Sequence, residues 1–593
     1  IIATGGYVAA PILVAASILK KLRLIRTRVF MHEQNAVPGQ LNRLMGRFAD
    51  TIFVTFPETL DYFPRRGSLV GYPLRKSIGE IRREEALRKI DFKIPEGRKI
   101  VLVFGGSQGS RNINRALVDA LQHLLPHRES LFIIHGVGLS NTKAYNAVED
   151  TKMRLQRTYS ETQLRKIDAF YISKPFFYHI EHLYAVCDLV VARAGSGSLN
   201  EISARGLPAL IIPKSNLPGD HQVLNARSME RAGAVEILYE QIAPIENKLL
   251  EIIDGKTFAD RLMDMLQDEG NLERMKRQCK SFFNHDALIR IQHHIESGST
   301  GANRQAPAVL QPEKESSLPH NTALARLLEK EALRHRQDYA PQMVIPRRQD
   351  LEYLKNRASA LLVHPAWQNR NLGVKLLGLL GAEDKIPALL VLLFEKKPVS
   401  RIKKLLGGDF EQVGFIRRNI FTALMRLDLL SPQIEKALQA GLTDPYYEVR
   451  AQAAHAVAHF GPRLQSIDAL VPELKKLLSD PNIDVVLAAA EALGSTGGEK
   501  DALPALLGMW DARLWKVRSA VLRGILHLVK RGVIRNPEVI EEESAKFILT
   551  STDFRPHFEL KAVHRHLLDL ISKQKEKDLS EKTDEIHSNH TMV

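Results

Sequence analysis

A turn built only from small residues, Ala194-Gly195-Ser196-Gly197-Ser198, is the first part of the sequence whose chemistry can be inferred. It follows the apolar run 189–191, which has the length of a buried strand, and precedes 199–205, which has the pattern of a short helix. Such a turn presents unpaired backbone N–H groups and the positive end of a helix dipole, which together suit a phosphate. Glu201, about one turn into the helix, is placed to accept hydrogen bonds from a ribose. The combination indicates a nucleotide-sugar ligand.

Two further glycine turns have the same character. Gly5-Gly6 leads into a helix from about Pro11, and 105–110 (GGSQGS) lies between the apolar strand 100–104 and a helix from Arg111. The spacing of the second turn is neither G-x-G-x-x-G nor that of a P-loop. It still predicts the strand–turn–helix unit of a nucleotide-binding half-domain.

Polar side chains gather where a third strand ends. The short strand 29–31 is followed by His32-Glu33-Gln34-Asn35, and ligands in open α/β sheets bind at the carboxyl ends of strands. Arg75, in the turn 71–75, either pairs with a diphosphate or is an ordinary surface charge, and the residue alone does not decide between them.

The elements that must position these groups alternate between strand and helix through about residue 242, which predicts an α/β fold. The sequence becomes highly charged from about Glu80, as expected for a hinge between two lobes. We therefore expect two lobes, at 1–85 and 86–297. The family resemblance described below implies that the first is a partial N-terminal acceptor or membrane lobe and that the second is the C-terminal UDP-sugar-binding lobe.

The second half of the chain has a different organisation. Residues 298–320 are rich in Ser, Gly, Pro and Gln and predict a linker. Across 321–571, Asp444-Pro445, Asp480-Pro481 and Asp511 mark helical units of similar length that resemble HEAT-like repeats, an all-α solenoid. The charged tail 572–593 lacks apolar periodicity, and we expect it to be disordered.

Composition sets limits on the partners. The 593 residues carry a net charge of +15, which suits an anionic membrane surface, a phosphorylated lipid or a nucleic acid. Basic and apolar residues interleave over 19–28, so this stretch is either a membrane-surface contact or the solvated end of a core helix. Two cysteines provide no disulfide framework, and we find no metal-ligand spacing, no nucleic-acid motif and no transmembrane run. We expect no metal and no cofactor.

Seven segments, in this order, resemble the MurG family, the peripheral-membrane transferases that move N-acetylglucosamine from UDP-GlcNAc to the undecaprenyl-linked muramyl-pentapeptide in bacterial cell-wall synthesis. The resemblance extends over about 1–297. It implies a metal-independent glycosyltransferase fold of the GT-B type, with two Rossmann-like lobes and an inverting displacement. The matching segments are GGYVAAP (5–11), HEQNAVPGQLN (32–42), GYPLR (71–75), GGSQGS (105–110), PFFYHIEHLYAVCDLVVARAGSGSLNEI (175–202), GLPALIIP (206–213) and DHQVLNA (220–226).

The resemblance also implies roles for individual residues. The donor diphosphate would meet the backbone N–H groups of Ser196, Gly197 and Ser198, Glu201 would bind the ribose, and the backbone of Phe177 would meet the uracil. Glu33 would act as the base or would orient Asn35, and we favour the second role. The implied donor-binding set is Asn35, Arg75, Ser107, Phe177, Ser196, Gly197, Ser198, Leu199, Asn200, Glu201 and Gln222, and the implied acceptor-binding set is Gly5, Gly6, Tyr7, His32 and Glu33.

The sequence departs from the family pattern at its start. A segment with a G-x-G-G-H loop precedes Ile1 in the family, so we expect an incomplete N-terminal lobe, either because the sequence is a fragment or because the chain is not a competent enzyme alone. The leading hypothesis is a MurG-like transferase at the cytoplasmic face of the bacterial plasma membrane, with a protein partner bound by the helical repeats. The alternatives are a transferase that acts on another lipid and a non-catalytic UDP-sugar-binding scaffold.

Overall fold

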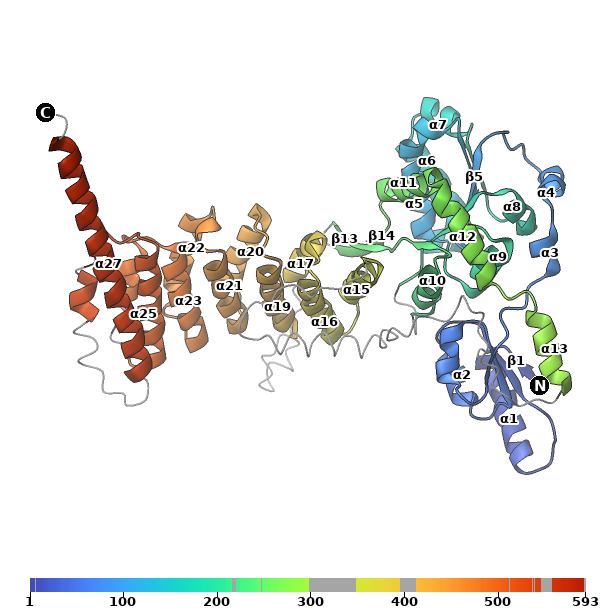
Figure 1. Cartoon of the computed structure of the whole chain (residues 1–593), viewed down its shortest axis with the longest axis horizontal. Helices are drawn as coiled ribbons and strands as arrows, with labels where there is room; N and C mark the ends of the chain where they lie inside the picture. Colours follow the sequence, from blue (N-terminus) through green and yellow to red (C-terminus); the bar gives the residue numbers. More distant parts are fainter. Residues whose placement is uncertain are drawn as a thin grey trace. The chain divides into compact units, whose positions relative to one another are not determined.

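The computed structural model divides the chain into two compact units, 1–241 with 251–317 and 242–250 with 318–593 (Figure 1). Gly6 and the predicted linker 298–320 lie outside the residues that the structure describes. The described residues are 1–5, 7–215, 220–246, 248–297, 348–394, 412–510, 512–535, 537, 539–544 and 557–590.

The first unit begins with a sheet of four parallel strands in the order β1-β2-β3-β4. One face packs on Leu13 of helix α1, and the other packs on helix α13 through Ile291 and Ile295, which lie against Phe30 and Phe53. We had assigned α13 to the C-terminal lobe, and the structure corrects this, because its apolar stripe covers the N-terminal sheet. The elements are β1 (Ile2–Ala3), η1 (Tyr7–Ala9), α1 (Ala10–Lys21), β2 (Phe30–Glu33), α2 (Gln40–Met45), β3 (Thr51–Val54), η2 (Pro57–Tyr62), β4 (Gly67–Leu69) and α13 (Ala287–Ser297).

A six-stranded parallel sheet, in the order β12-β11-β10-β5-β6-β9, forms the second lobe of this unit. Its central strands β5 and β10 are nearly continuous apolar runs because helices cover both of their faces. The predicted strands 100–104 and 189–191 are confirmed, each with one end shifted by one residue. The six strands are β5 (Lys99–Phe104), β6 (Leu131–Gly136), β9 (Tyr171–Lys174), β10 (Leu189–Ala192), β11 (Ala209–Ile211) and β12 (Glu236–Ile237).

The helices of this lobe occupy the connections between the strands, as a doubly wound sheet requires. Leu117 of α5 and Phe258 of α11 are both fully buried in the main core. The remaining elements are α3 (Lys76–Glu80), α4 (Arg83–Lys89), α5 (Arg111–Leu124), η3 (Leu125–His127), β7 (Asn141–Thr142), β8 (Tyr145–Asn146), α6 (Ala147–Thr158), α7 (Glu161–Ile167), α8 (Ile180–Val186), α9 (Ser196–Arg205), α10 (His221–Arg231), α11 (Gly255–Gln267) and α12 (Glu269–Phe282).

The second unit is a row of helices with the long members α16, α19, α21, α23 and α25 side by side (Figure 1). Two of the three aspartates that marked the repeats join neighbouring repeats: Asp444 accepts from Arg417 (2.7 and 2.9 Å), and Asp480 accepts from Arg450 (2.8 and 3.1 Å). Asp511 lies outside the described residues. The predicted solenoid is confirmed. Its helices are α15 (Arg348–Leu361), α16 (Trp367–Leu379), η6 (Glu383–Lys385), α17 (Ile386–Leu393), α19 (Gln412–Leu427), α20 (Pro432–Leu442), α21 (Tyr447–Phe460), η7 (Gly461–Arg463), α22 (Ile467–Leu477), α23 (Ile483–Thr496), α24 (Ala502–Leu507), α25 (Trp515–Lys530) and α27 (His557–His590).

Two expectations about the domain limits are wrong. Helix α27 continues through most of the tail that we predicted to be disordered, because its Lys, Glu and Gln are good helix formers and place opposite charges four residues apart. A hairpin of β13 (Gln241–Ile245) and β14 (Lys248–Ile252) carries the segment 242–250, which groups with the helical unit although it lies inside the predicted UDP-sugar lobe.

Candidate active site

The predicted phosphate cradle is the first turn of a helix. Helix α9 begins at Ser196 rather than at Leu199, with Gly195 as its N-cap and no capping side chain. The first backbone N–H groups of a helix have no partner within it, so those of Ser196, Gly197 and Ser198 are available to an anion. The Ser196 hydroxyl donates to the carbonyl of Gln34, which attaches this turn to the N-terminal lobe.

Two residues that we placed in the donor-binding set do not offer their side chains to the site. Leu199 is completely buried, and the Asn200 amide donates to the Ser196 carbonyl at 2.8 Å and is also buried. Both side chains point into the lobe because they lie on the inner face of α9. Only their backbone groups remain for a ligand.

Glu201 is held by a buried tyrosine. The Tyr184 hydroxyl donates to Glu201 Oε2 at 3.0 Å, and within the described residues no hydrogen bond reaches Oε1. Burial raises the pKa of Glu201, although the Tyr184 hydrogen bond and the Arg75 charge act in the opposite direction. The free oxygen therefore belongs to a carboxylate that Tyr184 keeps in place.

The turn 71–75 faces this helix from the N-terminal lobe. The Arg75 side chain is 65% exposed, and its Nη2 lies 4.0 Å from Glu181 Oε2. A Cβ built on Gly197 would lie 3.6 Å from the Tyr72 hydroxyl, so the backbone of the cradle and this turn are neighbours. The structure therefore brings Arg75 and the α9 N-terminus to the same region, where a diphosphate would contact both.

Glu33 is a buried carboxylate whose two oxygens are both in use. Oε1 accepts from the backbone and side-chain nitrogens of Asn35 (3.0 and 3.2 Å), and Oε2 accepts from Asn42 Nδ2 (2.7 Å) and Gly39 N (3.2 Å). These bonds have the geometry of the orienting role, because each carboxylate oxygen already accepts two hydrogen bonds.

Asn225 is a residue that we quoted within a motif but to which we gave no role. It is completely buried, its Nδ2 donates to Asn35 Oδ1 (3.1 Å), and its Oδ1 accepts from Ala36 N (2.8 Å). The Asn35 amide is thus held at both ends, by Glu33 and by Asn225. The only available signal was the position of Asn225 one helical turn after Gln222, on α10.

The structure describes some of the predicted acceptor-binding residues and not others. His32 Nε2 bonds the Gly71 carbonyl at 3.0 Å, and burial lowers the pKa of His32, so the neutral ring donates from Nε2. Gly5 has φ +92°, and a Cβ there would lie 3.0 Å from Asn42 Nδ2, so the turn needs glycine. Gly6 and the Tyr7 side chain lie outside the part of the chain that the structure describes.

The other predicted donor residues lie at strand ends of the second lobe. Ser107 is exposed, in a loop that passes so close to the next one that a Cβ on Gly109 would lie 1.9 Å from the Val137 carbonyl oxygen. The half-buried Phe177 ring packs beside Phe92, with 6.4 Å between ring centroids. Gln222 Oε1 accepts from Lys214 N at 3.0 Å, which fixes its amide at the start of α10.

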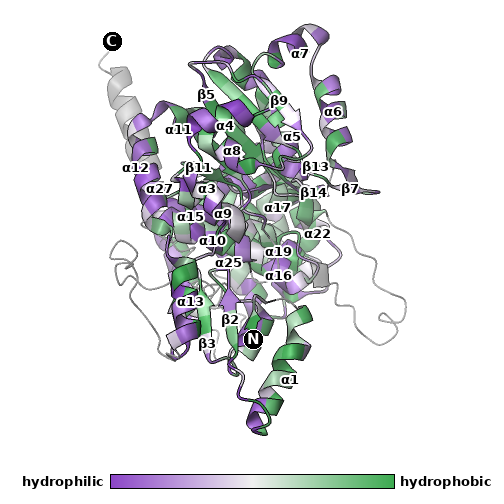
Figure 2. Ribbon diagram, turned by 90° about the vertical axis from the view of Figure 1, so that its right-hand side faces the viewer, coloured by the Kyte–Doolittle hydropathy of each residue, from purple (hydrophilic) through white to green (hydrophobic). Residues whose placement is uncertain are grey.

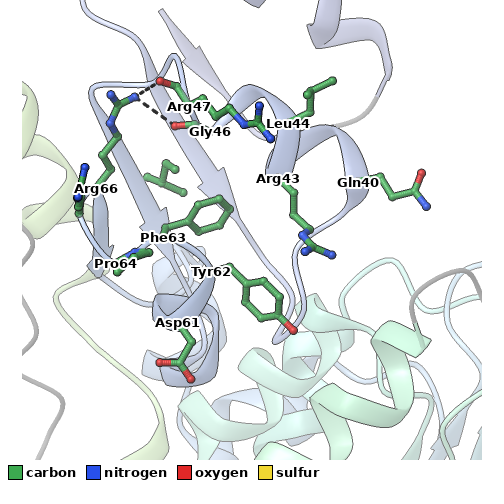
Figure 3. A pocket seen from close by; sticks show the side chains of 12 residues that line it. Gln40, Arg43, Leu44, Gly46, Arg47, Asp61, Tyr62, Phe63, Pro64 and Arg66 are labelled. Carbon is green, nitrogen blue, oxygen red and sulfur yellow. Dashed lines mark hydrogen bonds between the residues drawn. The ribbon is translucent and has the colours of Figure 1, made fainter. Parts of the chain in front are cut away.

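A separate basic hollow of about 850 Å³ lies on the N-terminal lobe (Figure 3). Arg43 stacks on the Tyr62 ring (5.3 Å), and Arg66 donates to the Ala49 carbonyl at 2.8 Å and to the Gly46 carbonyl. The hollow adjoins exposed apolar side chains of α2. Its lining is Gln40, Arg43, Leu44, Gly46, Arg47, Ile52, Asp61, Tyr62, Phe63, Pro64, Arg65 and Arg66.

Two features are absent from the described residues, a metal-binding cluster and a membrane-spanning helix. No three His, Cys, Asp or Glu side chains among them are grouped so that they could hold a metal ion. In the same part of the chain, no helix combines the length and the apolar character that crossing a bilayer requires.

Family models match most of the chain in three separate segments. Residues 100–280 match the glycosyltransferase family 28 C-terminal domain, and residues 1–54 match the glycosyltransferase family 28 N-terminal domain. Residues 434–525 match HEAT repeats. The first two matches contain the loops after β2, β5, β9, β10 and β11, whereas the turn 71–75 lies between the two matched segments.

Individual relatives are similar over the first half of the chain. A protein of Thermodesulfovibrio yellowstonii is 36% identical over 279 residues (47% of this chain and 67% of the relative), and one of Halothermothrix orenii is 34% identical over 306 residues (51% and 75%). Both are named UDP-N-acetylglucosamine–N-acetylmuramyl-(pentapeptide) pyrophosphoryl-undecaprenol N-acetylglucosamine transferase. The crystal structure of MurG from Acinetobacter baumannii is 23% identical, with a TM-score of 0.36, over 50% of this chain and 72% of that one.

Proposed function

Since the chain belongs to the MurG family of N-acetylglucosamine transferases, we propose that it transfers N-acetylglucosamine from UDP-GlcNAc to the undecaprenyl-linked muramyl-pentapeptide, which converts lipid I to lipid II in peptidoglycan synthesis. The observation that carries this proposal is the meeting of two groups from different lobes. Asn35, held by Glu33 and Asn225, lies beside the α9 turn whose Ser196 bonds the Gln34 carbonyl. A nucleotide-sugar that meets both groups contacts both lobes.

The donor is held by groups with complementary chemistry. The diphosphate accepts hydrogen bonds from the backbone of Ser196 to Ser198 and pairs with Arg75, while Glu201 Oε1 accepts from the ribose. Gln222 and Asn35 bind hydroxyl groups of the sugar, and both amides are pre-oriented by hydrogen bonds. Ser107 and the Phe177 backbone complete the contacts to the nucleotide.

The reaction is a single inverting displacement. The acceptor hydroxyl forms a bond to the anomeric carbon as the bond to the UDP oxygen breaks, and the hydroxyl proton passes to a base. Negative charge grows on the departing diphosphate, where the α9 dipole and the Arg75 guanidinium stabilise it without a metal ion. Glu33 positions Asn35 in this scheme, because both of its oxygens are already hydrogen-bonded.

A membrane surface is the natural location for a lipid-linked acceptor, and the N-terminal lobe carries a suitable face. Helix α1 exposes Ile12 (58%) and Ile18 (53%), and Leu22 (62%) is exposed directly after it. The helix ends in basic residues, and Figure 2 shows its mostly hydrophobic colouring. The basic hollow supplies Arg43 and Arg47 beside further exposed apolar groups. We place this face on the cytoplasmic leaflet of the plasma membrane, in peripheral contact.

The helical unit binds a protein partner in this proposal. Aromatic rings from three successive repeats form a continuous strip, with Trp367 stacked on Phe415 (5.7 Å) and Phe415 against Tyr446 (5.8 Å). Arg418 lies over the Phe415 ring at 5.4 Å. Half-buried aromatic and arginine side chains are typical of protein interfaces.

Calorimetric titration of the purified chain with UDP-GlcNAc, with UDP-glucose as the control, tests the proposal. We expect saturable binding of UDP-GlcNAc and clearly weaker binding of UDP-glucose. Equal affinities would remove the proposed N-acetylglucosamine specificity, and no binding of either would favour a non-catalytic scaffold. With binding established, formation of the glycosylated lipid from lipid I tests the transfer itself.

A further inference from the structure

Glu240, which the proposed function does not use, is the most enclosed carboxylate near the donor loops. Its side chain has no exposure to solvent. Oε1 accepts from Arg193 Nη2 (2.6 Å) and Asn112 Nδ2 (2.8 Å), and Oε2 accepts from Lys214 Nζ (3.1 Å). Burial alone would raise the pKa of Glu240, but the charges of Arg193 and Lys214 bring it below its ordinary value. The buried anion is therefore fully compensated.

The partners of Glu240 follow three different strands at the carboxyl edge of the sheet, and Ser110 is connected to them through Arg193. Ser110 and Asn112 follow β5, Arg193 follows β10, and Lys214 follows β11. Arg193 also donates to Ser110 Oγ through Nε (3.0 Å) and Nη2 (2.6 Å), and Nη1 donates to the Ile212 carbonyl (3.1 Å). We call Ser110, Arg193, Lys214 and Glu240 the loop clamp.

The loop clamp lies behind the donor residues that these loops carry. Ser107 precedes Ser110 in the first loop, and the α9 turn begins three residues after Arg193. In the third loop the backbone N–H of Lys214 holds Gln222. The uridine side is separate, because Phe177 follows β9 and packs on Phe92, and because Glu201, the proposed ribose acceptor, is held by Tyr184 of α8, outside the clamp.

A second carboxylate connects the clamp to the hairpin. Lys214 Nζ also pairs with Glu251, whose carbonyl accepts from Asn112 Nδ2 at 3.0 Å. Glu240 directly precedes β13, and Glu251 lies on β14. The residues between them in the chain, 242–250, group with the helical unit. Lys214 is thus paired with two glutamates that flank this segment in the chain, and both glutamates belong to the first unit.

We propose that Glu240 is a positioning residue for donor recognition: through Arg193 and Lys214 it sets the relative positions of the three loops that hold the diphosphate and the sugar, and Lys214 couples those loops to the hairpin. The proposal rests on the proposed function for the identity of the donor. It goes beyond that function in one respect. The contacts to the diphosphate and the sugar depend on the loop clamp, and the contact to the uracil does not.

Calorimetry on the full-length chain with UDP-GlcNAc and with uridine tests the first part. Glu240→Gln keeps the shape but removes the carboxylate that pairs with Arg193 and leaves Lys214 with Glu251 alone. We therefore expect about a tenfold loss of UDP-GlcNAc affinity and a change in uridine affinity below about twofold. The matched control is Glu236→Gln, whose carboxylate bonds Asn271 away from the clamp (3.0 Å) and whose loss should change neither affinity. Equal losses for both ligands would show a merely structural role and would overturn the proposal.

Lys214→Met tests the coupling without leaving a buried charge unpaired, since Glu240 keeps Arg193 and Asn112. In the wild type, we expect UDP-GlcNAc to slow amide hydrogen exchange in 241–252, and we expect this protection to be lost in Lys214→Met. Lys256→Met, which removes an exposed pair with Asp260, is the control and should keep the protection. Retained protection in Lys214→Met would refute the coupling.

A failure of the proposed function can be distinguished from a failure of the loop clamp. If the wild-type chain binds no UDP-GlcNAc, the proposed function is wrong, and the loop clamp is then tested by hydrogen exchange on the chain without ligand. Hydrogen exchange at 105–110 and 193–198 must still rise in both Glu240→Gln and Lys214→Met relative to their controls. Unchanged exchange there would reject the clamp as well.

Discussion

The Asn225 side chain donates to Asn35 Oδ1 at 3.1 Å and accepts from the neighbouring Ala36 N–H at 2.8 Å, so one buried amide joins helix α10 of the second lobe to the loop after β2 of the first. The Asn35 side chain is fixed by this bond on one side and by Glu33 on the other. The position of a donor-binding residue is therefore determined by both lobes together.

Replacing Asn225 by Ala should destabilise the first unit and weaken UDP-GlcNAc binding together. The change leaves the Ala36 N–H and Asn35 Oδ1 without their partner, and a lost buried hydrogen bond of this kind costs about 1–3 kcal/mol. Urea unfolding and calorimetry measure the two effects. Asn271→Ala, on the more exposed helix α12, is the control. An Asn225 variant with lower stability but unchanged affinity would separate Asn35 from the donor site.

Glu201→Ala should weaken UDP-GlcNAc binding by about 1–3 kcal/mol, because the ribose loses a charged acceptor. Tyr184→Phe is the matched comparison: it keeps the carboxylate but removes the hydroxyl that holds Oε2, so a smaller loss is expected. Unchanged affinity in Glu201→Ala would remove this residue from the site.

The raised pKa of Glu201 also predicts a pH dependence. Burial favours its protonated form, and a protonated carboxyl is a poorer ribose acceptor. UDP-GlcNAc affinity should therefore fall as the pH is lowered through this raised pKa, and the fall should disappear in Glu201→Gln. Titrations at several pH values measure it, and an identical profile in the variant would assign the dependence to another group.

Glu33→Gln distinguishes the two roles that we considered for this residue. If Glu33 orients Asn35, the variant loses acceptor capacity toward Asn35 and Asn42, and UDP-GlcNAc affinity falls. If Glu33 is the base, the donor affinity is unchanged and only the rate of transfer falls. We expect the first result, since both carboxylate oxygens are already engaged. Comparison of Kd with kcat measures the difference.

Much of this site followed from the local pattern, and the remainder depended on packing between distant segments. The small residues around Gly197 predicted a helix N-terminus because backbone geometry is a local property. The partnership of Asn35 with Asn225 joins residues 190 positions apart, and only the closed fold brings them together. Glu240 gave no signal, because a single glutamate after a short strand has the same local pattern whether it is exposed or buried.

The domain limits also depended partly on local pattern and partly on packing between distant segments. Strand positions in the first unit were predictable from apolar runs such as 100–104, which a buried parallel strand requires. The assignment of α13 to the N-terminal sheet was not, because its Ile291 and Ile295 stripe would suit any apolar face. The grouping of 242–250 with the helical unit likewise has no local signal.

His135 should determine part of the acid sensitivity of the first unit. It is completely buried between Tyr171 (2.8 Å) and Asn114 (3.1 Å), and burial lowers its pKa to about 3. Between the ordinary histidine pKa and this value, the unfolded chain binds a proton that the folded chain does not, so stability is full at neutral pH and falls as the pH decreases, by up to about 1.4 kcal/mol per pH unit. In His135→Gln, the free energy of unfolding, measured with urea at several pH values, should decrease less steeply as the pH is lowered. The exposed His123 provides the control substitution, and an unchanged slope in His135→Gln would contradict the assignment.

Arg450 and Asp480 should stabilise the solenoid without affecting donor binding. The pair joins α21 to the turn before α23, and its side chains are only 15% and 5% exposed. Asp480→Ala leaves the arginine partly buried and unpaired, which costs about 3–5 kcal/mol, whereas replacing both residues by apolar ones should recover part of that loss. Since the pair lies in the helical unit, the UDP-GlcNAc affinity of folded Asp480→Ala should equal that of the wild type. Unfolding followed by far-UV circular dichroism, together with calorimetry, measures both. A lower donor affinity in the folded Asp480→Ala variant would contradict the expectation that this pair acts only within the helical unit.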